Sequence, residues 1–353
     1  MRKPFLDNLR YSIVLLVIIY HVFYLFNSVG VIRNVDIPGI PVLDGVLYVL
    51  YPWFMATLFL ISGICARYSL EKQTGKAYLK SKLRRQLLPS IAVMFLIGWT
   101  SGWVTNQYVD IFGGNGSLIS GFAKYLIWCL SGIGPLWFLH ELLLCEGVLV
   151  LIRKLDKTDR LWSLGGRANL PVLCLMVFAL WGSAQILNTP LLEIYRNGFY
   201  LFAFLAGYAV FSHDRVQDLL AKWAPVLLIV SSVLAVCYTL RFWGENYAAM
   251  SNLKAFLTNA YAWFGCLAVL GAGKRWMDRE TGFTRCLAGR SFGFYVLHYP
   301  LLALLAYAMD QWFHLPVWSM YLLLPIALAV LLPPLIALIK RIPILRTLVL
   351  GEK

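Results

Sequence analysis

Residues 11–31 read YSIVLLVIIYHVFYLFNSVGV, a run dominated by hydrophobic side chains that contains His21 near its middle. The run is longer than the roughly 7–15 apolar residues of a signal-peptide core, and no small-residue cleavage motif follows it. Its length suits an α-helix that crosses a hydrocarbon layer about 30 Å thick. The stretch therefore predicts a first transmembrane helix that stays in the protein.

Similar apolar blocks recur along the whole chain. Of its 353 residues, 60% are hydrophobic and only 14% are charged, whereas a soluble domain carries about 25% charged residues. We therefore predict an all-α, polytopic integral membrane bundle of about ten transmembrane helices, as a single domain over residues 1–353 with no soluble domain. The predicted spans are 11–31, 45–67, 87–104, 133–152, 170–188, 194–212, 223–243, 253–273, 290–313 and 317–339.

The net charge of +14 has two interpretations, a nucleic-acid-binding surface or the basic loops that membrane proteins retain on the cytoplasmic side. With the N-terminus inside, almost all of the 31 Lys and Arg residues fall in cytoplasmic segments, Arg2 and Lys353 among them. A span missed near the middle would move every later loop to the other side and remove this asymmetry. The charge therefore indicates topology. It predicts an even number of spans, both termini cytoplasmic, contact with membrane lipids and no nucleic-acid partner. The basic residues left outside are Arg33, Lys124, Arg196, Arg241 and Lys254.

Motifs for metal or nucleotide chemistry are absent from the sequence. The seven cysteines are spaced singly within mostly apolar segments, which is typical of small hydrophobic residues in packed helices. There is no CxxC pair, P-loop, Rossmann glycine signature, HExxH or GxSxG. We therefore expect no metal site and no tightly bound cofactor.

Arg10 and His21 are the most informative polar pair. They are eleven residues apart, which is about three helical turns, so both lie on one face with an axial separation of about 16 Å. A guanidinium at the membrane rim suits a phosphate and a deeper imidazole suits proton transfer, so an extended donor such as an acyl-CoA thioester would span the two. The alternative is an arginine that reaches the interface and a structural histidine bonded to a carbonyl.

Other polar residues of the spans have structural and functional interpretations. Glu141 lies roughly 12 Å from the outer end of its span and either orients an imidazole, as an acidic triad member does, or packs against another helix. The run KSKLRR (80–85), which contains Lys82, Arg84 and Arg85, either anchors anionic lipid headgroups or binds a nucleotide's phosphates. His298 is either a satisfied core histidine or part of a site.

Four phrases resemble acyltransferase family 3, the ten-helix bacterial membrane acyltransferases that modify cell-surface glycans. FLDNLRYSIVLLVIIYH is similar to the family's opening signature, with Asp7, Arg10 and His21 at its matching positions. PWFMATLFLISGI (52–64), PLWFLHELLL (135–144) and RSFGFYVLHYPLL (290–302) resemble later phrases, the last of which contains Tyr295 and His298. One departure is that the family's Arg-x-x-Arg pair at the third helix is represented here by Lys82 and Arg85.

The resemblance implies an O-acyltransferase of the bacterial cytoplasmic (inner) membrane. It would move an acyl group, usually acetyl, from cytoplasmic acyl-CoA to a hydroxyl of a cell-surface, periplasmic or lipid-linked saccharide. His21 is the expected general base and Glu141 its partner. The residues expected to bind the donor are Asp7, Arg10, Lys82, Arg84, Arg85, Tyr295 and His298. A different class remains open, a proton-coupled transporter or flippase for a lipid-linked sugar or organic anion.

Overall fold

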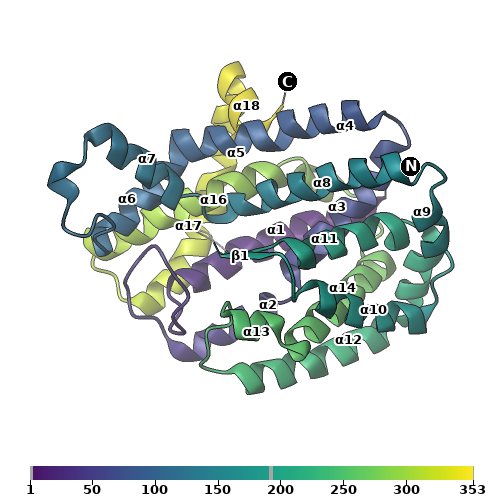
Figure 1. Ribbon diagram of the computed structural model, residues 1–353. Coiled ribbons are helices and arrows are strands. Elements are labelled where there is room, and N and C mark those ends of the chain that lie inside the picture. The colour runs from purple at the N-terminus through teal and green to yellow at the C-terminus, as the bar shows by residue number, and fades with distance from the viewer. Residues whose placement is uncertain (1–2, 191–193, 353) are drawn as a thin grey trace. The chain divides into compact units, whose positions relative to one another are not determined.

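The computed structural model describes residues 3–190 and 194–352, which are mostly helical (Figure 1). In this part of the chain, eight helical segments are long and apolar enough to cross a membrane, and two apolar helices are shorter. The all-α polytopic membrane bundle predicted from the sequence is confirmed. The number of crossings and the side of the termini stay predictions, and Arg2 and Lys353 lie outside the described residues. The eight segments are Pro4–Leu25, Pro41–Leu70, Gly75–Tyr108, Gly134–Leu155, Asp214–Phe242, Phe256–Trp276, Ser291–Gln311 and Val317–Arg341.

The chain divides into two compact units. Unit 1 comprises Met1–Leu16, Tyr48–Lys82 and Glu141–Gly289, and unit 2 comprises Val17–Leu47, Leu83–His140 and Arg290–Lys353. The prediction of a single domain over residues 1–353 stays a prediction. Three helices, α1 (Pro4–Leu25), α2 (Gly45–Leu50) and α8 (Trp137–Leu155), have residues in both units.

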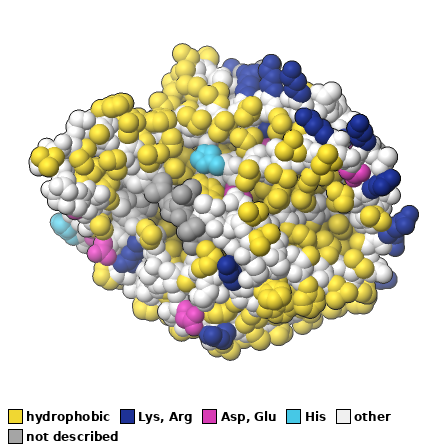
Figure 2. All heavy atoms as spheres, viewed as in Figure 1, with side chains coloured by type: hydrophobic (Ala, Val, Ile, Leu, Met, Phe, Trp, Pro, Cys, Tyr) yellow, Lys and Arg dark blue, Asp and Glu magenta, His cyan; other side chains and the backbone are white. Residues whose placement is uncertain are grey.

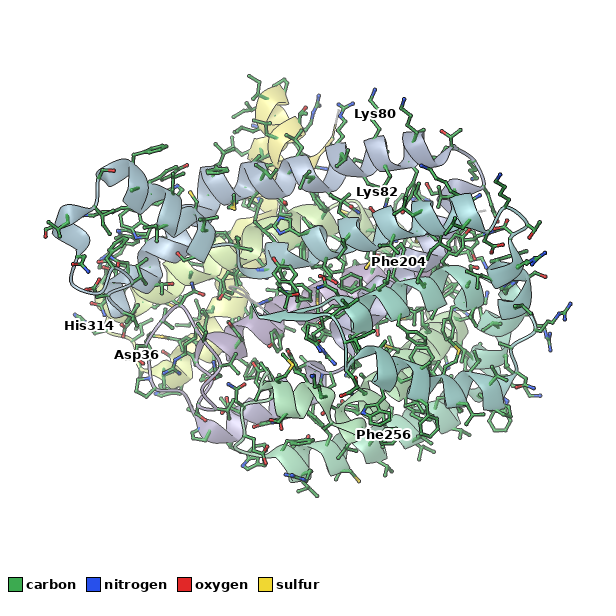
Figure 3. All side chains as sticks on the ribbon, in the orientation of Figure 1. Asp36, Lys80, Lys82, Phe204, Phe256 and His314 are labelled. Carbon is green, nitrogen blue, oxygen red and sulfur yellow. The ribbon has the colours of Figure 1, made fainter. Side chains whose placement is uncertain are left out.

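Unit 1 is built around close helix contacts. The Cβ of a residue at Gly63 of α3 would lie 1.9 Å from the carbonyl oxygen of Phe204 in α11, so only glycine allows this approach. Phe204 is labelled in Figure 3. The elements of this unit are α3 (Phe54–Leu70), α4 (Gly75–Lys82), α9 (Arg160–Gly165), α10 (Leu170–Ser183), β1 (Asn188–Pro190), β2 (Ile194–Arg196), α11 (Asn197–Ala206), η6 (Gly207–Phe211), α12 (Asp214–Phe242), α13 (Met250–Lys254), α14 (Phe256–Trp276) and α15 (Gly282–Ala288).

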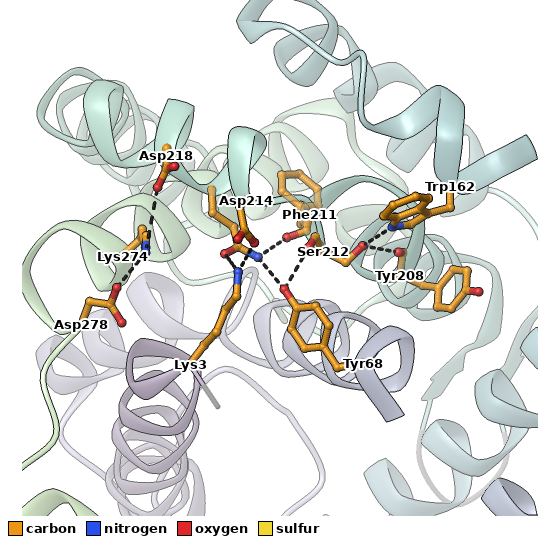
Figure 4. Close-up of polar contacts among 11 residues, drawn as sticks. Lys3, Tyr68, Trp162, Tyr208, Phe211, Ser212, Asp214, Asp218, Lys274 and Asp278 are labelled. Carbon is orange, nitrogen blue, oxygen red and sulfur yellow. Dashed lines mark hydrogen bonds and ion pairs between the residues drawn. The ribbon is translucent and has the colours of Figure 1, made fainter. Parts of the chain in front are cut away.

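Polar side chains fix the beginning of α1 within unit 1 (Figure 4). Lys3 forms an ion pair with Asp214, and its Nζ donates to Oε1 of Gln217 at 2.6 Å. Burial lowers the pKa of Lys3, but hydrogen bonds to Asp214 and Tyr68 outweigh it and leave that pKa above its usual value. The first helix is therefore held at its charged end by α12.

Unit 2 contains a hairpin of two helices that includes much of residues 105–132, the segment between two of the predicted spans. Helix α6 continues to Tyr108, and α7 packs beside it because Gly102 lets the Trp128 carbonyl approach closely. The elements of this unit are η1 (Pro41–Asp44), η2 (Leu83–Leu87), α5 (Leu88–Val93), η3 (Met94–Gly98), α6 (Trp99–Tyr108), η4 (Gly116–Leu118), α7 (Gly121–Ser131), η5 (Gly134–Leu136), α16 (Ser291–Gln311), α17 (Val317–Arg341) and α18 (Pro343–Leu350).

Several helices differ in their boundaries from the predicted spans. Helix α1 begins at Pro4 and ends at Leu25, so it is shifted toward the N-terminus from the predicted 11–31. Proline suits the first helical turn, and beyond the helix Gly30 has a φ of +76°, which breaks a helix. The segments predicted at 170–188 and 194–212 are shorter than expected, since α10 has 14 residues and α11 with η6 ends at Phe211.

Candidate active site

Two histidines from different helices meet in unit 2. His21 of α1 and His298 of α16 approach with Nδ1 of His21 3.2 Å from Nε2 of His298, and the ring centroids are 5.0 Å apart. His298 is fully buried, whereas His21 is only half-buried. The sequence expected both residues at a site but did not predict that they would touch.

The hydrogen bonds around this pair determine which nitrogens carry protons. Nδ1 of His298 lies 2.7 Å from the Tyr295 carbonyl oxygen, which can only accept, so this nitrogen donates and Nε2 keeps its lone pair. Nδ1 of His21 lies 2.7 Å from the Val17 carbonyl oxygen and faces that lone pair, so it too carries the proton. Nε2 of His21 then has a free lone pair, and it makes no hydrogen bond with any residue of 3–190 or 194–352. A neutral imidazole in this state can act as a base.

A tyrosine and an asparagine hold this pair in place. The Tyr299 ring packs edge-on against His21 at 5.0 Å between centroids, and its hydroxyl donates to Oδ1 of Asn34. Nδ2 of Asn34 donates in turn to Oγ1 of Thr105 at 2.7 Å. These contacts connect α16, the segment after α1 and α6, and hold the Tyr299 ring against His21.

Tyr295, which the family resemblance placed at the donor site, lies in the same unit. Its hydroxyl donates to the Pro135 carbonyl oxygen, and its ring packs against Phe138 at 5.7 Å. Two residues after Phe138, Nε2 of His140 lies 2.8 Å from Oγ of Ser90. Unit 2 therefore contains two histidine contacts, His21 with His298 and His140 with Ser90.

Arg10 lies in unit 1 and is held by two neighbours. Its Nη1 pairs with Asp7 Oδ1 at 3.1 Å and its Nη2 lies 3.0 Å from Sγ of Cys65, while 38% of the side chain remains exposed. Arg10 and His21 lie on one uninterrupted helix, as the sequence predicted. Asp7 thus acts on Arg10 and compensates part of its charge.

Lys82, predicted to bind phosphate, has a carboxylate partner. Its Nζ lies 2.6 Å from Oε1 of Glu146, which is fully buried and also accepts from the Tyr78 hydroxyl at 3.1 Å. In Figure 3, Lys80 projects away from α4 whereas Lys82 lies on the side toward α8. The sequence gave no sign of this pair, because 64 residues separate its members.

Basic side chains are concentrated on parts of the surface. Figure 2 shows Lys and Arg side chains gathered over α4 and α9 of unit 1, where Lys76, Lys80 and Arg160 are exposed. Arg84 and Arg85 are exposed in the π-helical turn η2 of unit 2. Both groups are accessible to an anionic ligand or to lipid headgroups.

Glu141 is 1% exposed, and neither of its carboxylate oxygens has a hydrogen-bond partner among the described residues. The contact expected between Glu141 and His21 therefore stays a prediction. Ser90, His140 and Glu146 acquire partners here that their positions in the sequence did not indicate. In the same described part of the chain, no group of three His, Cys, Asp or Glu side chains is arranged to hold a metal ion.

Comparison with known proteins connects this geometry to a chemistry. The family described as "Acyltransferase domain" matches residues 3–338. Proteins called "Glucans biosynthesis protein C" from two Escherichia coli strains, SMS-3-5 and O6:K15:H31, are each 23% identical over 324 residues, which cover 85% of this chain and 82% of theirs. No solved structure matches the chain.

Proposed function

This chain belongs to the membrane acyltransferase family 3, and from that premise we propose that it transfers an acyl group from acyl-CoA to a saccharide hydroxyl. An acyl-transferring membrane enzyme follows from the family. The proposal adds three points. The donor is acyl-CoA, with acetyl as the first candidate for the acyl group. The acceptor atom is a hydroxyl oxygen, and the enzyme lies in the bacterial cytoplasmic membrane. The acceptor class is supported by the glucans in the name of the Escherichia coli relatives.

The observation that carries the proposal is the open Nε2 of His21. A neutral saccharide hydroxyl is a weak nucleophile, so a base must remove its proton as the new bond to the carbonyl carbon forms. His21 has its Nδ1 fixed by the Val17 carbonyl and by His298, which leaves Nε2 for this role. Acyl transfer of this kind needs no metal ion or bound cofactor.

Donor binding is assigned to the basic residues. Arg10 retains exposed surface, and α1 places it about 16 Å along the helix from His21. Arg84 and Arg85 are exposed and suited to phosphates. Lys82 contributes less than the sequence suggested, because Glu146 already compensates its charge. Tyr295 and His298 of α16 support His21, because His298 contacts it and the Tyr295 carbonyl accepts a hydrogen bond from His298.

The test is acyl transfer by purified protein in lipid vesicles, with labelled acetyl-CoA and a glucan acceptor. His21→Gln keeps a polar side chain but lacks the base, so we expect the transfer rate to fall by about 10²–10⁴-fold. The matched control is His314→Asn, because His314 is exposed and has a φ of 49°, which asparagine tolerates. Unchanged transfer by a folded His21→Gln protein would refute the assignment.

A transporter is the second candidate, and the observation that favours it is the buried Glu141, which has no hydrogen-bond partner among residues 3–190 and 194–352. Unpaired carboxylates within membrane helices are typical of proton-coupled transport. Solute uptake that depends on a proton gradient, needs no acyl-CoA and is lost in Glu141→Gln would support this candidate over the enzyme.

A further inference from the structure

Ser90 has an unusual hydrogen bond for a serine inside a helix. Such a hydroxyl commonly bonds to a carbonyl three or four residues earlier, as Thr57 does to Trp53 and Ser183 does to Leu180. Ser90 in α5 instead has its Oγ 2.8 Å from Nε2 of His140, across to the beginning of α8. This distance is the one required between a nucleophile and its base.

The surroundings of this pair suit a nucleophile. Ser90 is fully buried, so an ester formed on it would be protected from water. His140 is partly exposed, and its Nδ1 makes no hydrogen bond within the described residues, so that nitrogen can carry the ring proton and leave Nε2 to accept from Ser90. Ser90 follows closely after the π-helical turn η2, a distortion frequent at functional sites.

We propose that Ser90 is the nucleophile that carries the acyl group between donor and acceptor, with His140 as its base; this inference rests on the proposed acyl transfer. Ser90 Oγ attacks the thioester carbonyl and gives its proton to His140 Nε2. The C–S bond breaks, and the thiolate leaves and takes a proton from solution. The products are an acyl-serine and a protonated His140.

In the second half-reaction the saccharide hydroxyl attacks the acyl-serine carbonyl and gives its proton to His21 Nε2. The ester bond to Ser90 breaks, and Ser90 Oγ recovers its proton from His140. His21 then releases its proton to solution, so both imidazoles return to their starting state. Two bases in one unit thereby receive separate tasks, one for the nucleophile and one for the acceptor.

Packing in unit 2 connects the two bases. The His298 ring lies 6.0 Å from that of Tyr295, which packs against Phe138 in the segment leading to His140. The absence of a GxSxG motif does not exclude a serine nucleophile, because that motif belongs to a strand-to-helix turn, whereas Ser90 lies within helix α5.

The experiment is to mix purified protein with labelled acetyl-CoA without acceptor, quench in acid and map the label by peptide mass spectrometry. We expect label on Ser90 of the wild-type protein that survives acid and is chased off by added glucan. Ser90→Ala should carry no label and should transfer at least about 10²-fold more slowly. Ser90→Cys should carry the label as a thioester, which hydroxylamine cleaves at neutral pH. Ser183→Ala, which removes a half-buried helix hydroxyl that bonds to its own helix, is the matched control and should behave as wild type.

Several outcomes would overturn the inference. These are label on His21, transfer by wild type with no labelled protein at single turnover, or full transfer by Ser90→Ala. None of these outcomes would contradict the proposed acyltransferase function, because acyl transfer itself is still observed. If wild type fails to cleave the thioester even with acceptor, the proposed function fails together with this inference. Where Ser90→Ala does not fold, the Ser90→Cys result decides.

Discussion

Breaking the Lys82–Glu146 pair is expected to affect stability unequally, depending on which partner is removed. Glu146 is fully buried, whereas 24% of the Lys82 side chain is exposed. Lys82→Met removes the ion-pair partner of a buried carboxylate that also accepts from the Tyr78 hydroxyl, which should cost about 3–5 kcal/mol, the range for breaking a buried ion pair by removing one partner. Glu146→Gln leaves a lysine that can extend to water, so its cost should be nearer 1–2 kcal/mol.

Thermal unfolding in detergent, followed by loss of the monodisperse peak in size-exclusion chromatography, would measure the order of these variants. We expect wild type above Glu146→Gln and Glu146→Gln above Lys82→Met, with the double variant recovering part of the loss because no charge stays buried. Lys80→Met is the control, since it makes the same change at an exposed position of α4. Equal losses for the two single variants, or a double variant less stable than Lys82→Met, would refute the argument that burial of Glu146 sets the cost.

Two further changes test other parts of the structure. Gly63→Ala should destabilise the protein by about 1–3 kcal/mol, because its Cβ would meet the Phe204 carbonyl. The control Gly147→Ala has open space around it and should leave the melting temperature unchanged or slightly higher. Equal melting temperatures for the two variants would contradict the close contact at Gly63. Backbone hydrogen bonds from Leu161 and Arg160 hold the pKa of Asp156 below its usual value, so its contribution is present at neutral pH and is lost as pH falls through that lowered pKa. The hydrogen-exchange protection factors of the α9 amides, which correct for the intrinsic pH dependence of exchange, should therefore fall in acid, and in Asp156→Ala they should be low at every pH.

The sequence predicted the helices and their order well because each depends on local hydrophobicity. The run around His21 and the apolar stretch at 317–339 are long enough to be recognised alone. Contacts between helices depend instead on how each helix is rotated and tilted, which a single sequence does not determine. The partnership of His21 with His298, 277 residues later, therefore emerged only in three dimensions. The same holds for the pairing of Glu146 with Lys82, which the sequence did not indicate.

The pairing of His21 with His298 also changes which residue we expect to support the proposed base. Once His21 accepts a proton on Nε2, its ring is an imidazolium whose Nδ1–H faces the lone pair of His298 Nε2 at 3.2 Å. A neutral imidazole accepting that hydrogen bond fixes the ring orientation and stabilises the charge, the task of the carboxylate in a catalytic triad. Two imidazolium rings at this distance would repel strongly, so the pair gains at most one proton. Because His298 Nδ1 donates to backbone carbonyls of α16, which cannot pass a proton on, a proton taken from the acceptor must leave the pair through His21 before the next cycle.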